Sequence, residues 1–257
     1  MICNTTYYSI DSTGKYIGEY DASWNFLNTT SLHAPQFMIS HTNSTVKRLY
    51  VSSTSQLTVL DETMDILNVI IYQQAMGFAG LYYNTTSDYL LVAINTAPKI
   101  QVYSNSLTFI KSIVLPNPNN NIVEYNGMLY VSSTTSLIMV LLKETFIYSF
   151  SISCSVIKTI AIDLYGLIAA NCYGSQTNYI LLYNTNGTYT GISWLSPVPY
   201  VNSIGFDGTG NFIIAASFGL FIFTPNSRST SIRNLNSLSV ADTCVMKGMI
   251  YFLIMKK

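Results

Sequence analysis

The sequence carries very little charge. Only 9% of its 257 residues are charged, and the 12 basic and 12 acidic side chains cancel to a net charge of zero. A nucleic-acid-binding surface needs clustered Lys and Arg to displace the counterions of the phosphates. Here basic residues are adjacent only at Lys47-Arg48 and Lys256-Lys257. We therefore do not expect a nucleic acid as a partner.

The sequence also lacks long apolar runs. The clearest one, Leu137 to Leu142, is far shorter than the roughly 18 residues that a membrane-spanning helix needs, so no membrane span is expected. The opening Met1-Ile2-Cys3-Asn4 shows neither the basic start nor the apolar core of a secretory signal. We therefore expect a soluble chain in which no signal peptide is present.

Residues suited to catalysis or metal binding are scarce and scattered. His33 and His41 are the only histidines, and no cysteine or carboxylate has zinc-like spacing around them, so we expect both in surface loops. Glu124 falls in a predicted strand. The aspartates fall at predicted turns, where Asp hydrogen-bonds its own backbone: Asp11, Asp61, Asp65, Asp88 and Asp207. No glycine-rich phosphate loop or serine elbow occurs. We predict no catalytic residue, no metal and no cofactor.

What the sequence does contain is a repeat. A short apolar strand recurs about every 40 residues, followed by a small polar turn and a second apolar strand. A period of this length marks units that bury their apolar faces by stacking on one another, and four-stranded propeller blades have this length. The six copies are Leu49–Ser53, Leu90–Ala93, Leu129–Ser133, Leu167–Asn171, Phe212–Ala216 and Ile250–Leu253.

Each repeat extends to four strands, most of them apolar on both faces, as strands buried between neighbouring sheets are. We predict an all-β fold: a six-bladed β-propeller with four antiparallel strands per blade, in a single domain over residues 1–257. The last blade is predicted to be composite, with two N-terminal strands, Tyr7–Asp11 and Tyr16–Tyr20, joined to two C-terminal strands. The connection Ala22–Pro35 is predicted to hold at most one helical turn, and Pro116–Asn121 to be a loop between blades.

The fifth copy carries the most specific pattern. Ser203–Ala215 runs as an apolar strand, Asp, two variable residues, Gly-Asn and a second apolar strand, and it resembles the NHL repeat. Tyr50–Ser53 and Tyr130–Ser133 are similar to NHL and YVTN-type propeller strands, with Ser in place of the usual acidic residue. The resemblance implies a propeller. It leaves the activity open, because NHL-type rings serve as protein-binding, RNA-binding and enzymatic scaffolds alike.

The four cysteines allow three pairings. Cys154 precedes the first strand of its blade and Cys172 follows the second, so antiparallel pairing brings both to one end of the blade. We predict a disulfide between them. Cys3 and Cys244 belong to the composite blade, and four buried reduced thiols are the alternative.

Glycosylation motifs point to the outside of a cell. Sequons occur at Asn4, Asn28, Asn43, Asn84 and Asn186. An Asn- and Thr-rich sequence also produces sequons by chance, but glycans can supply the solubility that surface charge usually provides. We expect an extracellular or secreted protein.

The candidate ligand-binding residues are amides and aromatics at predicted blade starts and turns, which suit sugars and protein partners. They are Gln73, Gln74, Asn119, Asn120, Asn171, Tyr173, Trp194, Tyr200 and Asn236. The alternative is that tyrosines fill the outer layers while asparagines form turns.

The expected function is that of a non-catalytic recognition or assembly scaffold for a protein or glycan partner. A propeller enzyme of the lactonase or lyase type, with its site at the central channel, is one alternative. A structural or filament-forming glycoprotein subunit is another. Because the termini meet in one blade, homo-oligomers formed by strand exchange are a further hypothesis.

Overall fold

The computed structural model describes residues 7–10, 15–20, 25–42, 47–53, 55–71, 77–173, 178–195, 201–206, 212–216 and 219–223. These residues form 22 strands. They make six antiparallel sheets, four of four strands and two of three strands. None of the described segments is a helix that could cross a membrane.

The first sheet contains β1 (Tyr7–Ile10), β2 (Tyr16–Tyr20) and β3 (Phe26–Ser31). The second contains β4 (Phe37–Thr42), β5 (Lys47–Ser52), β6 (Gln56–Leu60) and β7 (Ile66–Ile71), and the third β8 (Phe78–Asn84), β9 (Tyr89–Ile94), β10 (Lys99–Ser104) and β11 (Phe109–Val114). The fourth contains β12 (Asn119–Tyr125), β13 (Met128–Ser133), β14 (Leu137–Leu142) and β15 (Thr145–Ser151). The fifth contains β16 (Val156–Ile162), β17 (Leu167–Tyr173), β18 (Asn178–Asn184) and β19 (Tyr189–Leu195), and the sixth β20 (Val201–Phe206), β21 (Phe212–Ala216) and β22 (Gly219–Phe223).

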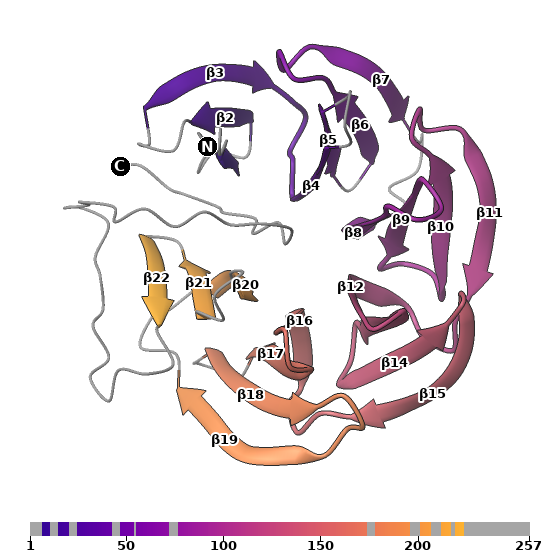
Figure 1. Cartoon of the computed structure of the whole chain (residues 1–257), viewed down its shortest axis with the longest axis vertical. Helices are drawn as coiled ribbons and strands as arrows, with labels where there is room; N and C mark the ends of the chain where they lie inside the picture. The colour runs from indigo at the N-terminus through magenta and orange to yellow at the C-terminus, as the bar shows by residue number, and fades with distance from the viewer. Residues whose placement is uncertain are drawn as a thin grey trace.

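The sheets are arranged around a common centre (Figure 1). Within every sheet the strand order follows the chain order. The inner strands β4, β8, β12, β16 and β20 contact one another in succession. The outer strands β3, β7, β11, β15 and β19 lie farthest from the centre. The repeat predicted from the sequence is therefore a repeat of antiparallel sheets, with a full set of four strands in the second to fifth sheets.

The core lies between consecutive sheets. In β9, Leu90, Val92 and Ile94 belong to the apolar cluster shared with the second sheet. The alternate residues Leu91 and Ala93 belong to the cluster shared with the fourth sheet. Successive side chains of a strand point to opposite faces, so a strand that is apolar throughout is buried on both faces. This burial was predicted from the sequence and is confirmed for the middle strands of the third sheet.

Two sequence-based assignments are wrong. Phe26–Ser31, within the connection predicted to hold at most one helical turn, is strand β3 and pairs with β2. The N-terminal segment therefore supplies three strands to its sheet, not two. Pro116–Asn121 was predicted as a loop, but β12 begins at Asn119, because the asparagine side chains bond to neighbouring sheets instead of forming a turn. The predicted C-terminal strand Ile250–Leu253 lies outside the described residues.

Because the strands alternate in direction, the ring has two distinct faces. One carries the turns between second and third strands and the connections into the next inner strand. It also holds Cys154 and Cys172, and we call it the disulfide face. The other carries the turns between first and second and between third and fourth strands, and we call it the turn face.

Consecutive sheets are also joined near the turn face by a repeated contact. A side chain of one outer strand bonds to the turn between the third and fourth strands of the next sheet. The four instances are Asn28 Nδ2 to the Thr63 carbonyl at 2.7 Å, Asn68 Nδ2 to the Ser106 carbonyl at 2.8 Å, Lys111 to Glu144, and Tyr148 Oη to the Thr185 carbonyl at 3.1 Å.

Candidate functional site: the disulfide face and the sheet interfaces

Four inner strands share a structural irregularity near the disulfide face, whereas β4 pairs with β5 without one. The pairing of β8, β12, β16 and β20 with the following strand shifts between Phe78 and Leu81, Asn119 and Asn121, Ile157 and Thr159, and Val201 and Ser203. Each shift inserts one extra residue into the inner strand, as a β-bulge does. A bulge re-aims the side chain that it carries, and bulges are frequent beside functional sites.

The extra residues in β12 and β16 reach across to the next inner strand. Asn120 Nδ2 donates to the Ile157 carbonyl at 3.1 Å, and Lys158 Nζ donates to the Val201 carbonyl at 3.2 Å. The Lys158 residue as a whole is exposed, but partial desolvation of its amine lowers the pKa of this group below its ordinary value. No carboxylate contacts this amine among the described residues. Lys158 was not singled out from the sequence, although its place one repeat after Asn120 is a signal that could have found it.

Two further predicted amides are also used between sheets. Asn119 and Asn171 are fully buried. Asn119 Nδ2 donates to the Lys99 carbonyl at 3.0 Å, and Asn171 Nδ2 lies 3.5 Å from the Val201 carbonyl. Their Oδ1 atoms have no hydrogen-bond partner in the described part of the chain. These amides hold neighbouring sheets together, and the prediction that they bind a ligand stays a prediction.

The other predicted ligand-binding residues are dispersed. Tyr173 is 48% exposed at the end of β17, beside Cys172. Trp194 lies in β19, and its side chain is outside the described part. Gln73, Gln74, Tyr200 and Asn236 fall outside the described residues.

In the two Tyr-Val-Ser-Ser blocks, the last serine caps the turn that follows its strand. Ser53 Oγ accepts the backbone N–H of Gln56 at 3.0 Å and so caps the turn between β5 and β6. Ser133 Oγ caps the equivalent turn by accepting from Thr135 and Leu137, both at 3.1 Å. A hydroxyl can thus hold the turn without adding charge.

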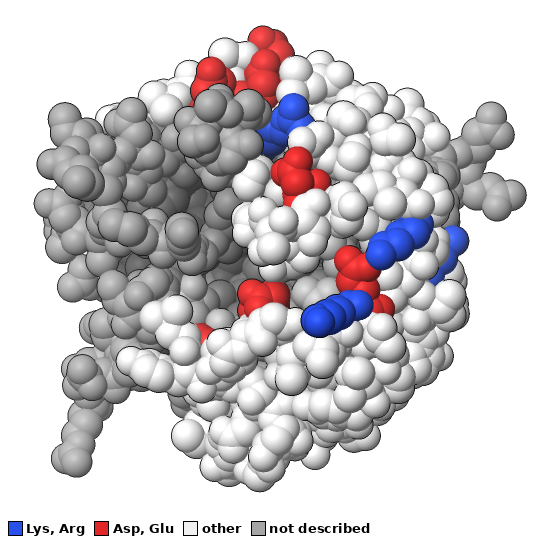
Figure 2. Space-filling model, turned by 45° about the vertical axis from the view of Figure 1, so that its right-hand side comes forward, with Lys and Arg blue, Asp and Glu red and all other residues white. Residues whose placement is uncertain are grey.

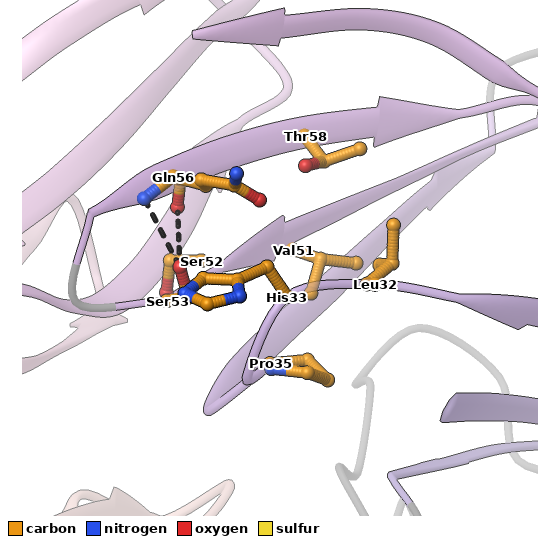
Figure 3. Close-up of a pocket in the computed structure, with 8 residues that line it drawn as sticks. All are labelled: Leu32, His33, Pro35, Val51, Ser52, Ser53, Gln56 and Thr58. Atoms are coloured by element: carbon orange, nitrogen blue, oxygen red, sulfur yellow. Dashed lines mark hydrogen bonds between the residues drawn. The ribbon is translucent and has the colours of Figure 1, made fainter. Parts of the chain in front are cut away.

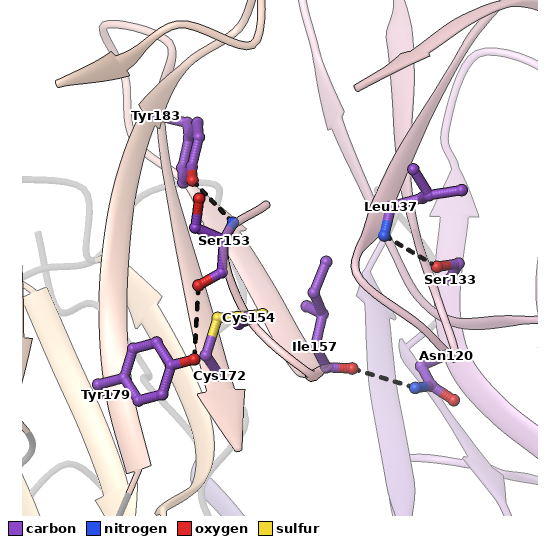
Figure 4. Close-up of a disulfide and its surroundings, with 9 residues drawn as sticks. All are labelled: Asn120, Ser133, Leu137, Ser153, Cys154, Ile157, Cys172, Tyr179 and Tyr183. Carbon is purple, nitrogen blue, oxygen red and sulfur yellow. Dashed lines mark hydrogen bonds between the residues drawn. A yellow bond between two sulfur atoms is a disulfide. The ribbon is translucent and has the colours of Figure 1, made fainter. Parts of the chain in front are cut away.

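The predicted disulfide is confirmed. Cys154, just before β16, and Cys172, in β17, are bonded, with their Cα atoms 5.8 Å apart (Figure 4). Two tyrosines hold the same loop: Tyr183 Oη accepts the Ser153 N–H at 3.0 Å, and Tyr179 Oη donates to the Ser153 carbonyl at 3.5 Å. Cys3 and Cys244 lie outside the described residues.

A crevice on the same face is lined by His33, Pro35 and the end of β5 (Figure 3). His33 is exposed, as predicted. The crevice is shallow: its roughly 150 Å³ of empty space includes open solvent, and it encloses no room even for a water-sized molecule. Ligand pockets usually measure roughly 300–1,000 Å³, so this crevice is not a ligand pocket.

A polar cluster that the sequence did not reveal joins the second and third sheets at the turn face. The prediction that His41 lies in a surface loop is wrong, because His41 is in β4 and only 9% exposed. Its ring stacks on Tyr83, with 4.0 Å between centroids. Burial lowers the pKa of His41; the Asp88 carboxylate opposes this shift and the Arg48 guanidinium adds to it. His41 and Tyr83 both lie near the turn-face ends of consecutive inner strands. Ser40 pairs with Leu49 and Tyr83 with Leu90, so an alignment of the repeats places Tyr83 opposite Ser40 and would not have paired it with His41.

The rest of this cluster is a chain of hydrogen bonds. Tyr83 Oη donates to the Asp88 carboxylate, which also accepts Asn105 Nδ2 at 2.7 Å. The Asn105 carbonyl accepts Arg48 Nη1 at 2.8 Å and Tyr50 Oη at 3.0 Å. Burial is the main reason that the pKa values of Tyr83 and Tyr50 are raised. The cluster thus joins β4 and β5 to β8 and to two turns of the third sheet.

The carboxylates have mostly local roles. Asp61 Oδ1 accepts the backbone N–H groups of Thr63 and Asp65, both at 2.9 Å, which confirms its predicted place in a turn. Glu124, at the end of an inner strand, accepts the N–H of Gly127. Among the described residues, no three His, Cys, Asp or Glu side chains gather at a possible metal site.

Three of the five predicted glycosylation sites can be placed. Asn28 is tied through Nδ2 to Thr63. Asn84 Oδ1 accepts the N–H groups of Thr86 and Ser87 at the turn after β8. Asn186 is exposed, with Oδ1 accepting the Thr188 N–H at 2.9 Å. Asn4 and Asn43 lie outside the described residues.

Comparison with known proteins identifies the class of fold. No protein-family model matches this chain, and no curated protein does. Its structure is similar to the Neurospora crassa Pan2 WD40 domain, with a TM-score of 0.61 and 10% identity over 85% of this chain and 75% of that one. It is also similar to BBS1N in complex with ARL6DN, with a TM-score of 0.60 and 12% identity over 80% and 69% of the two chains.

Kuenenia stuttgartiensis hydrazine synthase is another similar structure, with a TM-score of 0.57 and 12% identity over 79% of this chain and 69% of that one. At these identities the likeness concerns the fold alone. The chain therefore has a β-propeller-like fold built from repeated antiparallel sheets, whereas membership of the NHL type stays a prediction.

Proposed function

We propose that this protein is a non-catalytic propeller scaffold whose disulfide face binds a protein partner. The observation that carries the proposal is the way the loops of this face are held. Serine caps fix two turns, while the disulfide and two tyrosine hydroxyls fix the connection into β16. Loops already ordered before binding lose less conformational entropy when a partner binds, which favours affinity.

The contact is proposed to centre on Tyr173. This side chain is 48% exposed, and its register partner Val156 in β16 is 36% exposed beside it. Tyrosine is enriched in the energetic centres of protein interfaces because it buries a large ring while keeping a hydroxyl for hydrogen bonding. Similar folds also occur in protein complexes, as in BBS1N with ARL6DN.

The finer architecture is part of the same proposal. Six sheets in chain order support six blades in a single domain, with the ring closed where the N-terminal sheet receives the C-terminal residues. The sequence pattern of Ser203–Ala215 supports the NHL type. An extracellular location, supported by the Cys154–Cys172 disulfide, fits this scaffold, because disulfides persist in oxidising compartments. Glycans are then expected at Asn186 rather than at Asn28, whose Nδ2 already bonds to Thr63. Mass spectrometry of natively produced protein tests the location and the glycans.

Site-specific photo-crosslinking tests the binding face. A photoreactive phenylalanine analogue at position 173, in protein produced by its native source, is expected to capture one discrete partner. The matched control is position 165, because Tyr165 is 87% exposed but lies at the turn between β16 and β17, on the opposite face. Equal labelling from both positions, or no crosslinked species from position 173, would contradict the proposal.

A further inference from the structure

The outer strands leave an apolar rim around the described part of the ring. In β3, β7, β11 and β15 the pairing with the third strand shifts so that one extra residue sits near the start of the outer strand. That residue is aliphatic and exposed every time: Leu27 at 53%, Leu67 at 51%, Ile110 at 40% and Ile147 at 52%. The apolar residue before it is exposed as well: Phe26, Ile66, Phe109 and Phe146.

Such a rim is unusual for a protein that stays alone. An outer strand exposes unpaired backbone N–H and C=O groups, and proteins normally protect such edges with charged residues, bulges or capping groups. Lys111 is the one charged residue in the sequences of β3, β7, β11, β15 and β19. Charged side chains are also few on the described surface seen in Figure 2.

The outer strands differ in how their edges are protected beyond the bulge. In β3 and β7, Asn28 Oδ1 and Asn68 Oδ1 each accept the N–H of the following residue at 2.8 Å. β11 carries Lys111, and β19 contains Gly191. Strand β15, Thr145–Ser151, has no charge, glycine or proline, and no side-chain cap on its backbone N–H groups among the described contacts.

We propose that two copies of this chain associate edge to edge and antiparallel through the outer strand β15. No described strand pairs with the outer edge of β15, and six of its seven residues are exposed. A second copy supplies an identical uncharged strand, so both edges gain hydrogen bonds and cover Phe146, Ile147 and Tyr148. Because the chain's net charge is zero, two copies do not repel each other. A charged strand from a different partner would lose its hydration on binding, and β15 itself has no opposite charge to compensate for that loss.

The contact involves the outer edge of β15 in the fourth sheet, whereas Tyr173 lies in the second strand of the fifth sheet. The dimer proposal therefore does not depend on whether a partner binds near Tyr173. Sedimentation velocity tests the dimer, and photo-crosslinking at position 173 tests the partner.

Sedimentation velocity over about 1–100 µM protein tests the proposal. The wild type is expected to dimerise with concentration. Ile147→Lys is expected to raise the dimer dissociation constant about tenfold or more, because antiparallel copies bring two like charges into the contact.

Leu67→Lys is the matched control, with the same chemistry at the equivalent bulge of β7 and almost the same exposure of 51%. It is expected to change the dissociation constant by less than about twofold. Both variants should keep the wild-type melting temperature, since surface substitutions usually shift stability by less than about 0.5 kcal/mol.

Crosslinking locates the contact directly. Ser149→Cys in β15 is expected to give an oxidation-dependent covalent dimer, whereas Ser112→Cys in β11, also an exposed serine of an outer strand, is not. A wild type that stays monomeric throughout, equal effects of Ile147→Lys and Leu67→Lys, or recruitment to neutral phosphatidylcholine vesicles in place of dimerisation would each overturn the proposal.

Discussion

At the scale of single residues, uncharged polar side chains do the work that ion pairs do in many other proteins. Asn120 and Asn171 bond backbone carbonyls of neighbouring sheets, and Ser53 and Ser133 close turns. A hydrogen bond of this kind contributes about 0.5–1.5 kcal/mol net. Its repetition around the ring explains how a chain with 9% charged residues specifies its sheet interfaces.

His41 is expected to make stability depend on pH. Burial lowers its pKa below the ordinary value of 6.5, so below that pH the unfolded chain binds the proton more readily than the folded one. The free energy of unfolding should therefore fall as the pH drops from about 7 to about 5. In His41→Phe, which keeps a ring against Tyr83, this fall should be smaller. Denaturant titrations across this range measure it. His33→Phe, at an exposed position, should behave as the wild type, and identical profiles for all three proteins would exclude the role of His41.

Gly80 marks a close approach of the inner strands β8 and β12. A Cβ atom there would lie 2.6 Å from Asn121 Cα and 2.7 Å from the Asn120 carbonyl oxygen, both backbone atoms that cannot rotate away. Gly80→Ala is therefore expected to lower the free energy of unfolding by about 1–3 kcal/mol. Gly127→Ala is the control: its Cβ would meet nothing within 4 Å, so only the cost of its positive φ of 77° remains. The prediction fails if chemical denaturation gives the two variants equal stability.

At the scale of strands and loops, the Cys154–Cys172 disulfide closes a segment of 18 residues. Constraining a loop of this length in the unfolded chain stabilises the folded state by about 3 kcal/mol. The double variant Cys154→Ala/Cys172→Ala should lose about 2–4 kcal/mol of unfolding free energy. Reducing agent should destabilise the wild type by a similar amount and leave the double variant unchanged. A double variant that still responds to reductant would place the effect at another cysteine pair.

The elements that the sequence predicted best are the buried ones. Middle strands such as β9 are apolar throughout, and their period of about 40 residues predicts their stacking. Strand β3 was missed because Asn28, Thr29 and Thr30 look the same in an exposed edge strand as in a loop. The bulges that aim Asn120 and Lys158 across the sheet interfaces were not predictable either, because a bulge is set by the pairing of two strands rather than by local residue preference. Only the position of Lys158, one repeat after Asn120, indicated that the two side chains have equivalent roles.

At the scale of the whole molecule, the described interfaces run from the first sheet to the sixth. Each pair of consecutive sheets shares an apolar cluster; between the first and second sheets it contains Ile17, Met38 and Leu49. The first sheet therefore stabilises the second through this shared cluster. Lys47 and Glu19 add an ion pair of 3.4 Å across the same interface.

Removing residues 1–21 tests how the ring is completed. The deletion takes away β1 and β2, including the buried Ile17, and leaves β3 without the strand it pairs with. If the N-terminal sheet closes a six-bladed ring, the truncated chain should lose cooperative unfolding, because both neighbouring sheets gain an exposed face or edge. Calorimetry and near-ultraviolet circular dichroism measure this loss. Replacing Leu164 by Ser, a 63% exposed residue of the turn face, controls for losing a surface apolar group. A truncated chain that melts cooperatively at the wild-type temperature would show that the other sheets are stable without the first, and closure through the N-terminal strands would then be wrong.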